Sequence, residues 1–158
     1  MEFMQKIKDY FARLEDAFDN ESIVLLRSDG IALYSKIAHE KLDANTIGAL
    51  TSGLWQAAST LGAQCVKSSA REFRLSFDTS GSGIYVLPIK FNEEELYLCA
   101  LYDNLINPAL FKRNLQIIAS SLEETLKGPQ KKMNAKSREE FLFDQISDEE
   151  MDSLFNFK

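Results

Sequence analysis

Two β-rich segments on either side of Asp29-Gly30 constrain the fold of this chain more than any other feature of its sequence. They are residues 22–27, Ser-Ile-Val-Leu-Leu-Arg, and residues 31–35, Ile-Ala-Leu-Tyr-Ser. Asp-Gly between such segments predicts an antiparallel hairpin closed by a type I′ turn, because that turn requires positive φ. The first segment is apolar at nearly every position, which indicates a central strand covered on both faces.

Three segments have the apolar spacing of amphipathic helices, at residues 1–20, 43–63 and 107–126. Asp43 is placed to cap the second helix, and Asn107-Pro108 provides an N-cap followed by proline at the first helical position of the third. Each helix is expected to turn one stripe inward. The stripes are Phe3, Ile7, Tyr10, Phe11, Leu14, Ala17 and Phe18; then Ile47, Leu50, Leu54, Ala58 and Leu61; then Phe111, Leu115, Ile118, Leu122 and Leu126.

The second helix is unusually rich in small residues, including Gly48, Ser52, Gly53 and Ser59, and Trp55 lies beside them in the helical projection. Glycine inside a helix costs roughly 0.5–1 kcal/mol relative to alanine. A helix that carries two glycines therefore indicates close packing against another element. We interpret Trp55 as a residue of the core or of an interface.

Three further strands are expected at residues 71–78, 84–91 and 96–102. In the first, Phe73, Leu75 and Phe77 alternate with polar residues, the pattern of a half-buried strand and plausibly an edge strand. Pro88 indicates an irregularity or a local edge in the second, because proline cannot donate to the sheet. The third is apolar throughout, which favours a central position.

These elements predict an α/β fold with the order α-β-β-α-β-β-β-α. The strands form a single five-stranded antiparallel sheet, with the first and third helices on one face and the second helix on the other. The domain is expected to span residues 1–126, followed by a polar, lysine-rich linker at 127–136. Residues 137–158 form a tail with a short amphipathic helix.

At this level the chain resembles the Roadblock / dynein-light-chain family. The resemblance is carried by the hairpin Ile23-Val-Leu-Leu-Arg-Ser-Asp-Gly-Ile-Ala-Leu33, the small-residue helix 43–63, the strands within 71–102 and the helix that begins at Asn107-Pro108. It covers about residues 1–126 and rests on element order and a degenerate hairpin pattern, without an invariant motif.

The resemblance implies a protein-interaction module and no enzyme. Members of the family form homodimers, or heterodimers with a paralogue, through the second helix and the middle strand, so that two sheets join into one. The dimer is a platform for small Ras-like GTPases, and bacterial members resemble regulators of polarity and gliding motility that supply no catalytic group. The interface residues expected here are Gly48, Ser52, Trp55, Ser59, Phe73, Leu75 and Phe77.

The tail resembles a different protein, the flagellar switch protein, in the N-terminal peptide that docks phosphorylated response regulators. That peptide has a Glu-Ile-Asp-Ala-Leu pattern, and here Glu150-Met151-Asp152-Ser153-Leu154 is similar. A response regulator, a different protein partner, self-docking and a merely solvating tail all remain open. The expected contact residues are Ile146, Glu150, Met151, Asp152, Leu154 and Phe155.

No set of residues in the sequence has the pattern of a catalytic, metal or cofactor site. His39 is the single histidine and lies in a polar loop, and Cys65 and Cys99 share no metal-type spacing and are interpreted as reduced, structural thiols. The loop 79–83 lacks the Gly-Lys-Ser/Thr ending of a phosphate loop. A net charge of -6 argues against nucleic acid as a partner, no apolar run is long enough for membrane insertion, and we expect a cytoplasmic protein.

Two other classes fit parts of the sequence. Secretion chaperones are also small, acidic and dimeric, but they usually place three strands between the first two helices, and the six residues between Ser35 and Leu42 leave no room for a third. A profilin-like small-molecule sensor would place a pocket between residues 81–83 and the loop at His39, although no polar cluster points to a ligand.

Overall fold

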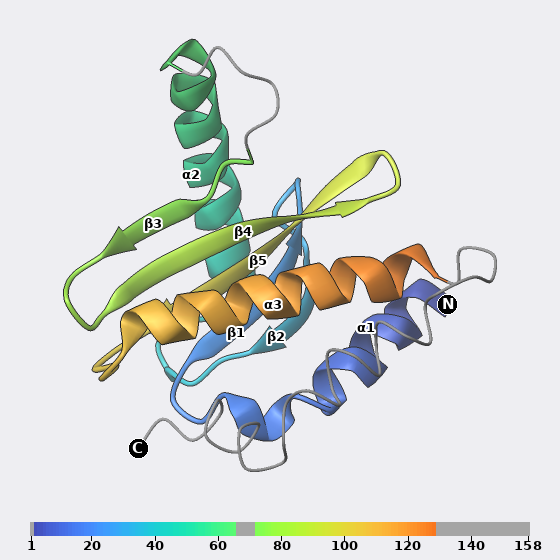
Figure 1. Ribbon diagram of the computed structural model, residues 1–158, viewed down its shortest axis with the longest axis horizontal. Helices are drawn as coiled ribbons and strands as arrows, with labels where there is room; N and C mark the ends of the chain where they lie inside the picture. The colour runs from blue at the N-terminus through green and yellow to red at the C-terminus, as the bar shows by residue number, and fades with distance from the viewer. Residues whose placement is uncertain (1, 66–71, 129–158) are drawn as a thin grey trace.

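The computed structural model describes residues 2–65 and 72–128, and in this part of the chain the predicted order of elements is confirmed (Figure 1). Two strands, and not the three of the chaperone order, lie between the first two helices. The elements are α1 (Glu2–Ala12), a short 3₁₀ helix η1 (Glu15–Ala17), β1 (Ser22–Arg27), β2 (Ala32–Lys36), α2 (Ala44–Cys65), β3 (Leu75–Asp78), β4 (Gly83–Phe91), β5 (Glu94–Tyr102) and α3 (Pro108–Lys127).

The strands form one antiparallel sheet in the order β2-β1-β5-β4-β3. The continuously apolar strands β1 and β5 are adjacent at its centre, as their sequences predict, because only a position covered on both faces hides every side chain of a strand. β2 and β3 form the two edges. β3 is shorter than the predicted strand at 71–78 and pairs with β4 only from Leu75 to Asp78 among the residues described.

Helices cover both faces of the sheet in the predicted arrangement. α1 and α3 lie side by side on one face, and α2 lies on the other and extends past the edge of the sheet (Figure 1). Between the sheet and the α1/α3 layer lies the larger core, which includes Phe11, Leu25, Leu98, Leu115 and Leu122. A smaller core that includes Val24, Trp55, Val86 and Tyr97 lies under α2.

The predicted caps hold the starts of two helices. The Asp43 carboxylate accepts hydrogen bonds from the amides of Asn45 and Thr46 at 3.0 and 2.9 Å, and the Asn107 side chain accepts from the amide of Leu110 at 3.0 Å. The first helix differs from the prediction, because α1 ends at Ala12 and η1 continues the chain as a tighter turn. Phe18 is nevertheless buried beyond this break, so the apolar stripe still faces the core.

The turn of the first hairpin is not type I′, which corrects the sequence prediction. Gly30 has a φ of 86°, but Asp29 is not among the residues with positive φ. The Gly30 amide donates to the Arg27 carbonyl at 2.9 Å, and the pairing of β1 with β2 shifts register between Leu25 and Leu26. This is a type I turn followed by a left-handed glycine, the longer of the two common hairpin solutions.

Candidate interaction surface on the second helix and the edge strand

The first half of α2 is packed onto the sheet of its own chain. Trp55 is only 6% exposed, and its ring lies over that of Tyr97 on β5 with 4.8 Å between the ring centroids. Ile47 is buried beside it, and the Thr51 hydroxyl lies 3.5 Å from the thiol of Cys99. Burial raises the pKa of the Cys99 thiol to about 11, so this cysteine is a structural thiol as predicted.

Two small residues of α2 allow the helix to cross the first hairpin closely. A Cβ added to Gly48 would lie 1.9 Å from the Gly30 carbonyl oxygen, so the two backbones touch and neither position tolerates a side chain. One turn later the Ser52 hydroxyl donates to the Ser28 carbonyl at 2.8 Å. The small residues at these positions are therefore required for packing within the chain.

This placement changes the expected interface. Gly48 and Ser52, predicted to face a second chain, contact the first hairpin of their own chain instead, and Trp55, for which core and interface were both open, lies in the core. Ser59 is half-buried, and its hydroxyl donates to the Gln56 carbonyl in the same helix at 3.2 Å. Any surface that α2 offers to another molecule must lie on the opposite side of the helix.

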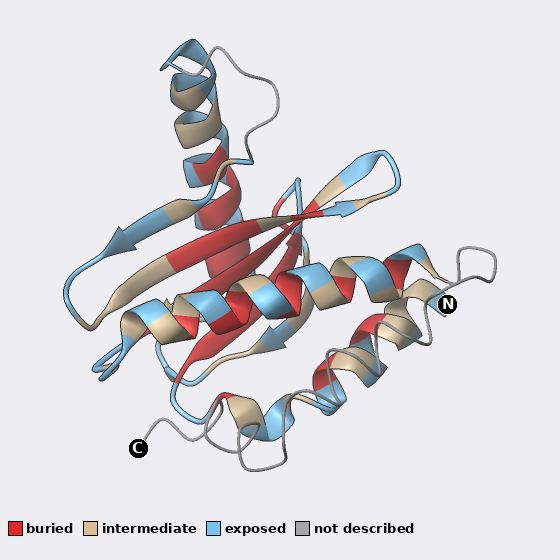
Figure 2. Ribbon diagram, viewed as in Figure 1, coloured by how far each residue is buried: buried red, intermediate tan, exposed pale blue. Residues whose placement is uncertain are grey.

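That opposite side is apolar and exposed. Leu50 is 69% exposed, Leu54 43% and Leu61 65%, although their apolar helical spacing predicted that all three would face the core. Gly53 lies among them, and a Cβ added to it would meet no described atom within 4 Å beyond the adjacent backbone of its own helix. In Figure 2 the buried residues of α2 stop near its middle, and the half that extends past the sheet is exposed or intermediate.

The whole of α2 lacks charge, a signal that was available in the sequence. None of its 22 residues, Ala44–Cys65, is Asp, Glu, Lys or Arg. A helix with one face in water normally carries charged residues there, whereas depletion of charge marks the centre of protein–protein interfaces. The exposed face of α2 therefore has the composition of an interface.

The edge strand β3 continues this surface. Phe73 and Leu75 are half-buried against the core under α2, but Phe77 on the same side of the strand is 76% exposed. Phe77 pairs with Ile84 of β4, which pairs with Leu101 of β5, and both partners are only half-buried. These three side chains form an apolar row on the α2 side of the sheet. We call this row and the exposed face of α2 the α2 surface.

The two edges of the sheet differ in how they resist pairing with another strand. β2 is interrupted by the register shift, and the Lys36 side chain at its end is bonded to the Glu15 carbonyl. β3 pairs in regular register with β4 and exposes an aromatic residue. Bulges and lysines are common protections of an edge strand, so within residues 2–65 and 72–128 β3 is the edge that is open to pairing. Pro88, predicted at a local edge, lies beyond the last β3–β4 pair at Val86.

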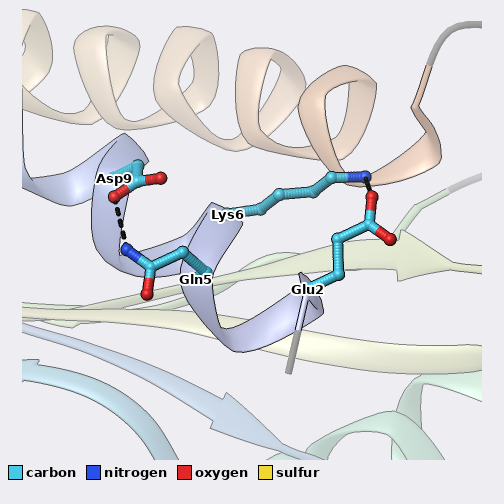
Figure 3. Close-up of a pocket in the computed structure, with 4 residues that line it drawn as sticks. All are labelled: Glu2, Gln5, Lys6 and Asp9. Carbon is cyan, nitrogen blue, oxygen red and sulfur yellow. Dashed lines mark hydrogen bonds and ion pairs between the residues drawn. The ribbon is translucent and has the colours of Figure 1, made fainter.

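Other parts of the described chain offer less for recognition. A hollow on α1 is lined by Glu2, Gln5, Lys6 and Asp9, which pair among themselves: Glu2 with Lys6 at 3.1 Å, Gln5 with Asp9 at 2.7 Å (Figure 3). In residues 2–65 and 72–128 no three His, Cys, Asp or Glu side chains are grouped to hold a metal ion.

The structure also gives the positions of Cys65, His39 and the loop at residues 81–83. Cys65 is exposed at the end of α2, which corrects its interpretation as a structural thiol, and His39 is exposed in its loop. Residues 81–83 are tied to the segment before α3 by a hydrogen bond from the Leu105 amide to the Gly81 carbonyl at 2.9 Å. The tail residues Ile146–Phe155 lie outside the described part. Within that part no helix is long and apolar enough to cross a membrane.

Comparison with solved structures identifies the architecture. Myxococcus xanthus MglB superposes with a TM-score of 0.62 at 17% identity, over 83% of this chain and 95% of MglB. The gliding protein MglB of Thermus thermophilus gives 0.58 at 15%, over 80% and 93% of the two chains. A Roadblock/LC7 domain from Streptomyces avermitilis gives 0.54 at 18%, over 66% and 83%. No protein-family model and no curated protein sequence matches this chain.

Proposed function

Starting from a chain that has the Roadblock/LC7 fold found in bacterial MglB, we propose that it forms a two-fold dimer through the α2 surface and the edge of β3. The single observation that carries the proposal is the exposed face of α2, a helix without charge that presents Leu50, Leu54 and Leu61 to solvent. Such a patch is a liability for a monomer, and a second copy is the occupant that the open edge of β3 favours.

Each element of the α2 surface suits a symmetric contact. In a two-fold dimer the same patch meets itself, so an apolar helix face and an unpaired strand edge both find complementary partners. Gly53 has empty space on its own chain, and the missing Cβ would let a second helix approach closely. Of the residues predicted for the interface, Phe77 fits this contact best, and Phe73 and Leu75 lie next to it.

The dimer is tested by sedimentation of the full chain. We expect the native protein to sediment as a dimer at micromolar concentration. The double variant Leu50→Glu/Leu54→Glu should sediment as a folded monomer, because four glutamates would be buried at the contact. Ile117→Glu is the matched control, since Ile117 is 51% exposed on α3 at the other side of the sheet. A monomeric native chain would refute the dimer.

The second part of the proposal concerns the partner. Among the structures that share this fold is a gliding protein, and the Roadblock resemblance implies a dimeric platform for a small Ras-like GTPase. We assign the chain to the regulation or scaffolding of such a GTPase in the cytoplasm of a bacterium, in cell polarity or motility. It supplies no catalytic group of its own and acts by positioning residues of the GTPase.

The GTPase partner is tested with purified Ras-like GTPases from the same cell, loaded with GDP or with a non-hydrolysable GTP analogue. We expect binding by the native dimer in one nucleotide state, and loss of that binding in Leu50→Glu/Leu54→Glu. The rate of GTP hydrolysis with and without the dimer separates a stimulating regulator from a scaffold. Absence of binding in both nucleotide states would refute this partner.

For the tail we propose a separate role, supported by the sequence of residues 146–155. The acidic and apolar pattern there would form a short helix that docks on another protein through Ile146, Met151, Leu154 and Phe155, and a response regulator is one candidate. Affinity capture with the full chain and with a variant that lacks residues 137–158 tests this. Capture of the same partners by both would refute a partner-binding tail.

A further inference from the structure

The edge strand β3 is attached to the domain by different chemistry on its two faces. On the α2 side, Leu75 packs against the smaller core. On the α3 side, the strand presents Ser76 and Asp78, which are polar. Attachment of β3 to the α3 layer therefore depends on polar contacts, because hydrophobic packing is not provided by the side chains on that face.

One lysine of α3 makes these contacts. The Lys112 ammonium donates to the Ser76 hydroxyl at 2.7 Å and forms an ion pair with the Asp78 carboxylate. It also lies 5.4 Å from the centre of the Tyr85 ring on β4, within the range of a cation–π interaction. The side chains of Lys112 and Asp78 are 22% and 25% exposed, so water screens this pair less than a fully exposed one.

Two neighbouring hydrogen bonds extend the contact into a network. The Tyr102 hydroxyl of β5 donates to Asp78 at 2.8 Å, and the Gln116 amide of α3 donates to the Tyr85 hydroxyl at 2.8 Å. Hydrogen bonds from Lys112 and Tyr102 hold the pKa of Asp78 below its ordinary value. α3 is thereby connected to all three strands on this side of the sheet.

We propose that Lys112 is a positioning residue for dimer assembly, a role that rests on the dimer proposed above. β3 has four residues, Leu75–Asp78, and its described pairing is with β4 on one side. A short edge strand that moves must be ordered when a second copy binds, and that ordering opposes association. By holding Ser76 and Asp78, Lys112 orders the strand beforehand, which lowers the cost of binding.

The test compares dimer dissociation constants measured by sedimentation. Lys112→Met keeps the length of the side chain and removes its charge, and we expect it to raise the Kd on the order of tenfold. Arg113→Met removes a charge from the exposed neighbouring position and should leave the Kd unchanged. Lys112→Arg should restore most of the affinity, because a guanidinium can bind the same carboxylate.

Amide hydrogen exchange in the monomeric background Leu50→Glu/Leu54→Glu provides a second measurement. There Lys112→Met should accelerate exchange at residues 75–78 and leave the central strands β1 and β5 unchanged. Equal exchange at 75–78 with and without Lys112 would overturn the ordering of the strand by this residue.

The outcomes separate this inference from the dimer itself. A monomeric native chain would overturn the dimer and with it this role of Lys112. A dimeric native chain whose Kd is unchanged in Lys112→Met would overturn the role of Lys112 and leave the dimer standing. A lower melting temperature with an unchanged Kd would show that Lys112 only stabilises the fold, and would also overturn the inference.

Discussion

The two sides of the sheet are completed in different ways. On the α1/α3 side, two helices lie side by side and bury large residues of both, such as Phe11, Phe111 and Leu122. On the α2 side a single helix covers the sheet with the inner face of its first half, its second half extends beyond the sheet, and Leu50, Leu54 and Leu61 are exposed along its outer face. The first side is covered by two helices of the chain itself, whereas the second side leaves an apolar helix face exposed among the described residues.

This difference shows that one helix can have a core face and an exposed apolar face at once. α2 places Gly48, Ser52 and Trp55 against its own sheet and Leu50, Gly53 and Leu54 away from it. A monomeric protein would normally place charged residues on the second face. Substitutions on the two sides of the sheet, and on the two faces of α2, should therefore differ in their effects on stability and on dimer dissociation.

The largest effect is expected from a truncation in the α1/α3 core. Leu122 is fully buried, so Leu122→Ala should lower the free energy of unfolding by about 3 kcal/mol, from lost burial and the cavity left behind. Leu61→Ala, on the exposed end of α2, should change the stability of the monomer by less than about 0.5 kcal/mol. Urea denaturation in the monomeric background measures both. Equal losses would contradict the contrast between the two sides.

The next effect concerns the inner face of α2. Gly48→Ala should destabilise the monomer by about 2 kcal/mol, because the new Cβ would collide with the Gly30 carbonyl oxygen and backbone cannot move aside cheaply. Thermal unfolding measures the loss. The gain in helix propensity offsets part of it, so a variant more stable than the native chain would show that the helix and the hairpin do not touch.

On the outer face of α2, replacement of glycine by alanine should raise the stability of the monomer instead of lowering it. Gly53→Ala should stabilise the monomer by about 0.5–1 kcal/mol, since alanine is the better helix former and the position is open on its own chain. It should also raise the Kd of the dimer if two helices approach each other at Gly53. Unfolding at low concentration and sedimentation separate the two effects. Tighter dimers in Gly53→Ala would exclude close helix contact at this position.

The smallest effect concerns the contribution of Asp78 to stability, which should not depend on pH near neutrality. The pKa of Asp78 lies below its ordinary value of 3.8, chiefly because of the hydrogen bond from Lys112. A carboxyl with a lowered pKa in the folded state stabilises the fold above its unfolded pKa, and loses that effect as pH falls through the folded pKa. The stability difference between the native chain and Asp78→Asn should therefore stay constant from pH 7 to pH 5 and shrink below pH 4. A change between pH 7 and 5, measured by urea denaturation, would contradict the ion pair.

Much of the fold could be predicted from short-range patterns. The apolar runs of β1 and β5 indicated central strands, the Asp43 and Asn107 caps located two helix starts, and all five residues of the predicted α3 stripe are buried. These predictions succeed because alternation, helical spacing and caps depend on residues a few positions apart. The prediction of the turn type at Gly30 was wrong because two turn types accept Asp-Gly. The register of the whole hairpin decides between them.

The sequence by itself determined the order of the elements, the central strands and the scarcity of charge and abundance of small residues in α2. Only the tertiary structure decided which face of α2 is inside. Hydrophobicity favoured Leu50 and Leu54 as core residues, but the turn of the first hairpin comes too close to α2 for large side chains at the points of contact, and Gly48 and Ser52 are small enough to lie there. Steric fit between elements distant in the sequence overrode apolar spacing, and this placed the leucines on the surface where a second molecule can meet them.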